Sequence, residues 1–255
     1  MTTNPVLILG SIRGNILERV ETARLLGLDP VCVKFDESHS HSSLQTLTYE
    51  ELPEKLKAAP CILGAPRAYS DLSNERLDRR WLLSNSRFVE ELEELGFRNW
   101  LTLVHPSSSV SVAASFGGGC FVGPQVSISS DTRLGRFVSI GRSSSIGHDV
   151  FIGDFCSFGP GSVVPGNVVF GKFTLVGPAA TFLNGVRISE GSLIGAGSVV
   201  TKHVRNGRQV LGNPARTLRR PLAVLRRLLR QTTIHLLRKT GTYQRAKALY
   251  QRIRG

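Results

Sequence analysis

Residues 140–163 read IGRSSS-IGHDVF-IGDFCS-FGPGSV, four consecutive units of six residues that each open with a large apolar residue. The pattern extends without a skipped residue from Val110 to Arg205, which makes sixteen hexads. Every first position is apolar, no fifth position is larger than valine, and ten second positions are glycine. A six-residue period of this kind predicts a parallel β-helix, in which each hexad forms one face of a triangular coil.

Three hexads then make one turn, so residues eighteen apart stack at about 4.8 Å along the axis. One internal ladder is expected to contain Ile128, Ile146, Val164, Phe182 and Val200. Charged residues within the array occupy only the third, fourth and sixth positions, as expected if the first and fifth point into a dry interior. A β-sandwich with frequent glycine turns would not keep this phase over sixteen units.

The residues before the array alternate between apolar runs and helical patterns. The runs Val6–Leu9 and Val31–Phe35 flank a helical stretch that ends near Leu26, which indicates a βαβ unit. Further strands are expected at Cys61–Leu63 and Leu101–Val104, and further helices near Glu50–Ala58 and Leu72–Leu95. The predicted organisation is a small Rossmann-like α/β domain at 1–104, a β-helix at 105–215 and a helical tail at 216–255.

The net charge of +13 belongs to the tail. Residues 216–255 contain twelve Lys or Arg and no acidic residue, which leaves 20 basic against 19 acidic residues in the body. Leucines in the tail recur at helical spacing opposite arginines, so we expect a basic amphipathic helix that either lies on an anionic membrane surface or caps the end of the β-helix. No nucleic-acid-binding motif accompanies this charge, and nucleic acid is not an expected partner.

Neither a signal peptide nor a spanning segment is recognisable, and the four cysteines lack metal-ligand spacing. The sequence therefore predicts a cytoplasmic protein without a bound metal. The membrane alternative for the tail would place it peripherally at the inner face of the cell membrane.

The loop Gly10–Asn15 follows the first apolar run, where glycines would let backbone amides approach a phosphate. Ile12 occupies the place of the second glycine of a dinucleotide-binding motif, which argues against NAD. Two interpretations stay open: a structural turn, or a site for the phosphates of a sugar nucleotide that involves Gly10, Ser11 and Arg13.

Together, the α/β domain, the linker His105-Pro106-Ser107, the hexads and the ending Gly212-Asn213-Pro214-Ala215-Arg216 resemble the sialic acid O-acetyltransferase and bacillosamine N-acetyltransferase family of sugar acyltransferases. The resemblance covers roughly Pro5 to Arg220. It implies a left-handed β-helix homotrimer that transfers an acyl group, usually acetyl from acetyl-CoA, to a sugar amine or hydroxyl at sites between subunits. Most members have Gly-His-Gly in the first loop, where this chain has Arg13-Gly14-Asn15.

The family's catalytic motif corresponds to Gly147-His148-Asp149. By resemblance, His148 is the general base, a role to which a neutral imidazole is suited near pH 7. Asp149 would orient the ring, which requires a corner in the strand because neighbouring side chains otherwise point to opposite faces. Gly166 lies eighteen residues past His148, and its N–H would meet the oxyanion and contact the acyl-CoA.

In the last coil, Lys202 and Arg205 are candidates for the CoA phosphates. The sequence thus predicts an acetyl-CoA-dependent sugar or nucleotide-sugar N- or O-acetyltransferase of surface glycan biosynthesis. An alternative is a non-catalytic trimeric β-helix scaffold of a membrane-associated glycan-assembly complex. A γ-class carbonic anhydrase needs three zinc-bound histidines, and the hexads contain only His148 and His203.

Overall fold

The structure is a computed structural model that describes residues 4–9, 16–34, 46–63, 79–205 and 207–218. The chain divides into two units, Met1–Thr217 and Leu218–Gly255. The predicted tail helices and their membrane contact lie outside the described residues, as does the loop that contains Gly10, Ser11 and Arg13. Among the residues described, no helix has the length and apolar character needed to span a membrane.

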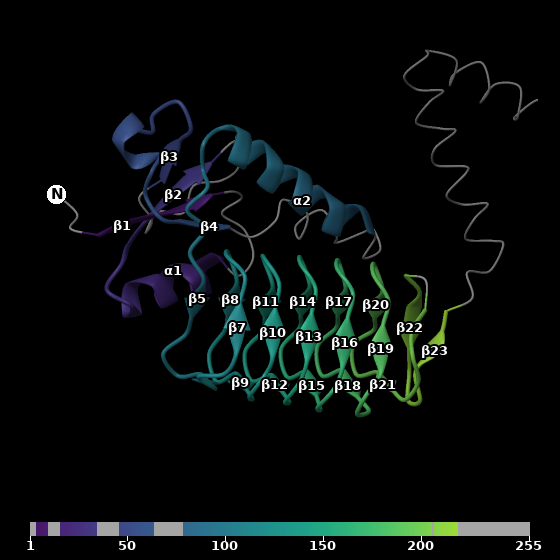
Figure 1. The fold of residues 1–255 in the computed structure, drawn as a ribbon. Coiled ribbons are helices and arrows are strands. Elements are labelled where there is room, and N and C mark those ends of the chain that lie inside the picture. The colour runs from purple at the N-terminus through teal and green to yellow at the C-terminus, as the bar shows by residue number, and fades with distance from the viewer. Residues whose placement is uncertain (1–3, 10–15, 35–45, 64–78, 206, 219–255) are drawn as a thin grey trace, which may run out of the picture. The chain divides into compact units, whose positions relative to one another are not determined.

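The first part of unit Met1–Thr217 is a four-stranded parallel sheet of strand order β3-β2-β1-β4 (Figure 1). The predicted βαβ unit is confirmed, because β1 and β2 pair in parallel on either side of α1. Strand β3 was not predicted, and a 3₁₀ turn replaces the helix expected near residue 54. The elements are β1 (Pro5–Leu9), α1 (Ile16–Leu25), β2 (Asp29–Lys34), β3 (Thr46–Thr48), η1 (Glu54–Leu56), β4 (Cys61–Leu63) and α2 (Arg79–Glu94).

The strand expected at Leu101–Val104 belongs to the β-helix rather than to the α/β sheet. Strand β5 (Leu103–Val104) pairs with β8, and the chain before it keeps an isolated parallel bridge from Trp100 to Cys61 of β4. The apolar pattern predicted this strand, but its partner depends on which neighbour lies closer in space, which local sequence does not specify.

The hexads form a left-handed parallel β-helix with three walls. Wall 1 consists of β6 (Ser109–Val110), β9 (Ser127–Ile128), β12 (Ser145–Ile146), β15 (Val163–Val164), β18 (Thr181–Phe182) and β21 (Val199–Val200). Wall 2 consists of β7 (Ser115–Phe116), β10 (Arg133–Leu134), β13 (Phe151–Ile152), β16 (Val169–Phe170) and β19 (Arg187–Ile188). Wall 3 consists of β5, β8 (Phe121–Val122), β11 (Ser139–Ile140), β14 (Ser157–Phe158), β17 (Leu175–Val176), β20 (Leu193–Ile194), β22 (Gln209–Leu211) and the antiparallel β23 (Arg216–Thr217).

Residues eighteen apart pair along each wall, as the period predicts; Ile146, for example, stands between Ile128 and Val164. The corners are made by the fourth hexad position, which has a left-handed backbone from Gly119 to Gly197, with φ between 54° and 77°. Second-position glycines are needed because coils touch there. A Cβ on Gly171 would lie 2.4 Å from the backbone nitrogen of Glu190 on the next coil.

The interior is one continuous core of first- and fifth-position side chains. Small polar residues at fifth positions are buried, and their hydroxyls donate to corner carbonyls; Thr132 donates to Gly147 at 2.7 Å, and Ser162 to Gly159 at 2.7 Å. Burial raises the pKa of the Cys156 thiol to about 12, so this fifth-position cysteine stays protonated and inert at neutral pH. The narrow part of the coil thus accepts polar atoms only where each has a partner.

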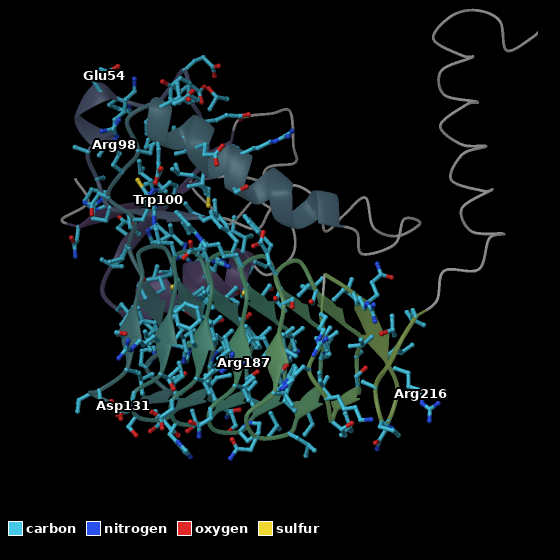
Figure 2. The ribbon with its side chains drawn as sticks, turned by 45° about the vertical axis from the view of Figure 1, so that its right-hand side comes forward. Glu54, Arg98, Trp100, Asp131, Arg187 and Arg216 are labelled. Atoms are coloured by element: carbon cyan, nitrogen blue, oxygen red, sulfur yellow. The ribbon has the colours of Figure 1, made fainter. Side chains whose placement is uncertain are left out.

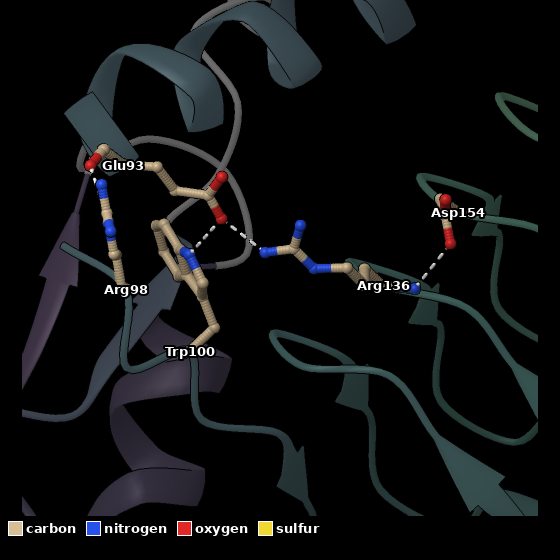
Figure 3. A network of polar contacts seen from close by, with 5 residues as sticks. All are labelled: Glu93, Arg98, Trp100, Arg136 and Asp154. Atoms are coloured by element: carbon tan, nitrogen blue, oxygen red, sulfur yellow. Dashed lines mark hydrogen bonds and ion pairs between the residues drawn. The ribbon is translucent and has the colours of Figure 1, made fainter.

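A polar network joins the α/β domain to the β-helix (Figure 3). Glu93 of α2 accepts hydrogen bonds from the indole N–H of Trp100, at 2.9 Å, and from the guanidinium of Arg136 on the β-helix. The backbone N–H of Arg136 donates in turn to Asp154 at 3.0 Å, and Asp154 pairs with Lys172 at 2.8 Å. Helix α2 therefore contacts the β-helix through Arg136, which is itself linked through Asp154 to Lys172 on the following coils.

Aromatic side chains reinforce this joint. Phe137, Phe155 and Phe173 occupy successive fourth positions at the corner between walls 2 and 3, with ring centroids 5.0 and 5.4 Å apart. Trp100 packs edge-on against Phe137 at 4.9 Å, and apolar residues of α2 belong to the same core cluster. We call this region, with Arg136, Asp154 and Lys172, the Phe137 corner.

The last coil departs from the period. Val204 pairs with Ile188, sixteen residues away rather than eighteen, while Val200 keeps its regular partner Phe182. The chain therefore passes from wall 1 to wall 2 with two residues fewer than in the preceding coil. The sixteenth hexad therefore fits the six-residue sequence pattern, but its last residues do not stack on the residues eighteen positions earlier.

Candidate active site

His148 stands at the corner between walls 1 and 2, two residues after Ile146 of β12. Asp149 follows with φ of 54°, so the chain turns there before it enters β13. The structure thus has the corner that a contact between these neighbouring side chains requires. We call the region of His148, Gly166 and Asn184 the His148 corner.

The turn brings the two side chains together. Nδ1 of His148 and Oδ2 of Asp149 lie 2.8 Å apart, and both side chains are 56% exposed. A hydrogen bond from Nδ1–H to the carboxylate leaves the lone pair of Nε2 available to accept a proton. The imidazole is therefore held on the outside of the coil, with Nδ1 oriented by Asp149 and Nε2 without a hydrogen-bond partner in the described segments.

Gly166 lies one coil further along the same corner, directly against the imidazole. A Cβ built on Gly166 would be 2.5 Å from both Cε1 and Nε2 of His148, so only glycine leaves room for the ring. The backbone of His148 accepts a hydrogen bond from Asn167 at 2.9 Å, which fixes the register between the two coils. The N–H of Gly166 donates to no group in the described part of the chain, although Gly166 itself is buried beneath the His148 ring.

Asn184 occupies the next level of this corner, eighteen residues past Gly166, and is exposed. Sequence reasoning did not name Asn184, although counting a further eighteen residues would have found it. The same count reaches Lys202, which is exposed in the shortened last coil together with Arg205. The structure therefore places the candidate base, the candidate oxyanion donor and a predicted phosphate ligand on one corner, in that order along the axis.

The α/β domain is anchored close to wall 3 by Arg19 of α1. Its guanidinium is buried, donates to the carbonyl of Leu63 at 3.0 Å and to Ser139 of the β-helix at 3.4 Å, and lies 4.5 Å from the ring centroid of Phe121. Burial lowers the pKa of Arg19 to about 10, so it keeps its charge at neutral pH. The predicted substrate contacts Gly10, Ser11 and Arg13 lie outside the described residues, and their role stays a prediction.

In the described residues, no group of three or more His, Cys, Asp or Glu side chains is arranged to hold a metal ion.

No family model and no curated protein matches this chain.

Solved structures do match it over most of its length. A variant of the perosamine N-acetyltransferase from Caulobacter crescentus, in complex with CoA and GDP-perosamine, is 22% identical with a TM-score of 0.72; the match covers 86% of this chain and 98% of that one. The acetyltransferase domain of PglB from Neisseria gonorrhoeae, in complex with acetyl coenzyme A, is 22% identical with a TM-score of 0.71, over 84% of this chain and 100% of that domain. WeeI from Acinetobacter baumannii is 21% identical with a TM-score of 0.70, over 84% and 100%. The chain therefore shares its fold, a small α/β domain followed by a left-handed β-helix, with these solved structures, as the sequence resemblance predicted.

Proposed function

We propose that this protein is an acyl-CoA-dependent N- or O-acetyltransferase that acts on a sugar or nucleotide sugar in surface glycan biosynthesis. The observation that carries the proposal is the contact between the His148 imidazole and Gly166 on the next coil. It puts a ring nitrogen beside a backbone N–H, and neither has a hydrogen-bond partner among the described residues. Acyl transfer needs these two groups next to each other, one for the proton and one for the oxyanion.

In this mechanism the acceptor amine or hydroxyl attacks the thioester carbonyl while Nε2 of His148 takes its proton. The tetrahedral oxyanion receives a hydrogen bond from the N–H of Gly166. Its collapse breaks the carbon–sulfur bond, and the CoA thiolate leaves and recovers the proton from the imidazolium. Asp149 orients the ring and stabilises its charged form through the 2.8 Å contact.

The cosubstrate and acceptor are supported by fold neighbours whose described complexes hold CoA with GDP-perosamine, or acetyl coenzyme A. Lys202 and Arg205 are proposed ligands of the CoA phosphates, since both are exposed cations beyond Asn184. A homotrimer with sites between subunits is part of the proposal, because His148 and Asp149 are more than half exposed in a single chain and a neighbouring subunit would close the site.

The test is the rate of CoA release from acetyl-CoA with a panel of amino sugars and their nucleotide conjugates. With an accepted sugar, His148→Ala should lower kcat by roughly 10²- to 10⁴-fold, the usual contribution of a general base. His105→Ala is the control, because His105 is a half-buried β-helix histidine whose ring, among the described residues, forms hydrogen bonds with Ser107 alone, at 2.8 Å to the hydroxyl and 3.1 Å to the backbone nitrogen. A kcat of His148→Ala close to that of the unaltered protein would refute the proposed base.

A further inference from the structure

The shortened last coil leaves one backbone donor without its regular partner. In the preceding coils, the N–H at the outward position of each wall 2 strand donates to the carbonyl seventeen residues on, as Val169 does to Val186 at 3.1 Å. By this rule Arg187 would donate to Val204. The carbonyl of Val204 instead accepts from Ser189 at 2.8 Å, because the pairing has shifted by two residues.

The imidazole of His203 replaces the missing carbonyl. Its Nδ1 accepts the backbone N–H of Arg187 at 3.0 Å. A ring nitrogen that accepts a hydrogen bond carries no proton, so the neutral ring must carry its proton on Nε2. The shift in register therefore fixes the tautomer of His203 and leaves its Nε2–H as a donor.

A hollow of about 340 Å³ lies at this place, lined among the described residues by Arg187, Ser189, His203, Val204 and Arg205. Figure 2 labels Arg187 on the β-helix. Every polar side chain of this lining can donate a hydrogen bond, and none is a carboxylate. In the part of the chain that the structure describes, neither Arg187 nor Arg205 forms an ion pair. Two unpaired guanidinium groups and a fixed N–H around one hollow are suited to an anion.

We propose that this hollow binds the pyrophosphate of the acyl-CoA, with Arg187, Arg205 and the Nε2–H of His203 as its donors. The assignment rests on the proposed function, because His148 marks where the thioester lies. The hollow is on wall 2, next to the His148 corner, and three coil levels from His148 amount to about 14 Å. The pantetheine arm has the backbone length of about four extended residues, again roughly 14 Å. A thioester at His148 would thus bring the pyrophosphate to the hollow.

Binding measured by calorimetry on the full chain tests this assignment without requiring turnover. Arg187→Gln removes one guanidinium but keeps the backbone N–H that His203 caps, and it should weaken the binding of CoA and of dephospho-CoA by on the order of tenfold. Binding of pantetheine, which has no phosphate, should not change. Arg133→Gln is the matched control, because Arg133 occupies the same outward position on wall 2 three coils earlier, and it should leave CoA affinity unaltered.

Two further measurements separate the role of His203 from simple folding. Nitrogen-15 NMR should show the neutral His203 ring as the Nε2–H tautomer. His203→Ala should weaken CoA binding, and His203→Gln, whose amide offers both an acceptor and a donor, should recover part of it.

The assignment would be overturned if Arg187→Gln weakened the binding of CoA and of pantetheine equally, or weakened neither. It would also be overturned if NMR showed the Nδ1–H tautomer of His203. A loss for CoA but not for dephospho-CoA would overturn it in favour of the 3′-phosphate. If acetyl transfer proves absent while CoA binding still depends on Arg187, the proposed function fails and the anion site stands. If Arg187→Gln changes the rate of acetyl transfer neither from acetyl-pantetheine nor from acetyl-CoA, the anion site fails and the proposed function stands.

Discussion

The His148 corner and the Phe137 corner are built from the same hexad positions, but their side chains pair in different ways. At the Phe137 corner, Arg136, Asp154 and Lys172 occupy successive third positions with alternating charge and are bonded from coil to coil, while the phenylalanines beside them stack. At the His148 corner, the third positions are His148, Gly166 and Asn184. Among the described residues, His148 alone of these has a charged partner, Asp149 on its own coil.

The difference teaches what a regular β-helix needs in order to bind another molecule. A ladder of large, mutually paired side chains closes a corner and attaches a second domain to it. A glycine in such a ladder breaks the pairing of side chains between levels and leaves room for an exposed imidazole to lie against the backbone of the next coil. Four predictions test whether the Phe137 corner has a structural role and the His148 corner a catalytic one.

The largest effect is expected for Phe137→Ala at the Phe137 corner. Phe137 is 6% exposed and contacts both Trp100 and Phe155, so truncation should leave a cavity and lower the free energy of unfolding by about 3 kcal/mol. Chemical denaturation measures this loss. Leu25→Ala is the control, since Leu25 is 58% exposed and should change stability by less than about 0.5 kcal/mol. Similar values for the two variants would show that the aromatic ladder does not hold the joint.

Gly166→Ala should separate chemistry from stability at the His148 corner. The new methyl group would collide with the imidazole, an exposed side chain that can swing aside, so Tm should change little. A displaced base should lower kcat by roughly 10²-fold. The control is Gly153→Ala, where the methyl group would lie 2.6 Å from the backbone nitrogen of Lys172, which cannot rotate away, so Tm should fall. A large Tm loss in Gly166→Ala would mean that the close contact is structural.

The comparison also shows what the sequence can predict. First- and fifth-position residues, the eighteen-residue stacking and the placement of His148 beside Gly166 all follow from the period, because each hexad repeats the same local conformation. Counting alone also reaches Asn184. These features depend on contacts between adjacent coils, which local sequence specifies.

Other features depend on contacts that no local pattern encodes. Glu93 meets Arg136 only because α2 docks along the β-helix, and Leu103 pairs with Phe121 rather than with the α/β sheet. In the last coil, Val200 and Val204 fit the first and fifth positions, yet Val204 pairs two residues out of phase. The role of His203 as acceptor for Arg187 follows from that shift and was missed for the same reason.

Asp149→Asn should have a moderate effect. Asparagine tolerates the left-handed backbone at this corner and can still accept a hydrogen bond from Nδ1, so only the negative charge is lost. Because the pair is exposed, kcat should fall by no more than about fivefold. Asp131→Asn removes the same charge at the same corner position one coil earlier, where φ is 57°, and should leave kcat unchanged. Equal effects would indicate a general influence of charge rather than orientation of the ring.

The smallest effect is expected for Asp154→Asn. Burial alone would raise the pKa of Asp154, but hydrogen bonds from Lys172 and from the N–H of Arg136, with the charges of both residues, outweigh it and lower the pKa. A carboxyl group whose pKa is lower in the folded state stabilises the fold above its unfolded-state pKa, and this stabilisation is lost as the pH falls through the folded-state value. The variant should therefore have a lower Tm at pH 7, by on the order of one degree for such a partly exposed pair, and the difference should vanish in acid below the ordinary aspartate range. The double variant with Lys172→Gln should show non-additive Tm changes at pH 7. Additive changes, or a difference that persists in acid, would mean that the charge ladder contributes nothing to the Phe137 corner and that its aromatic stack alone holds the two domains together.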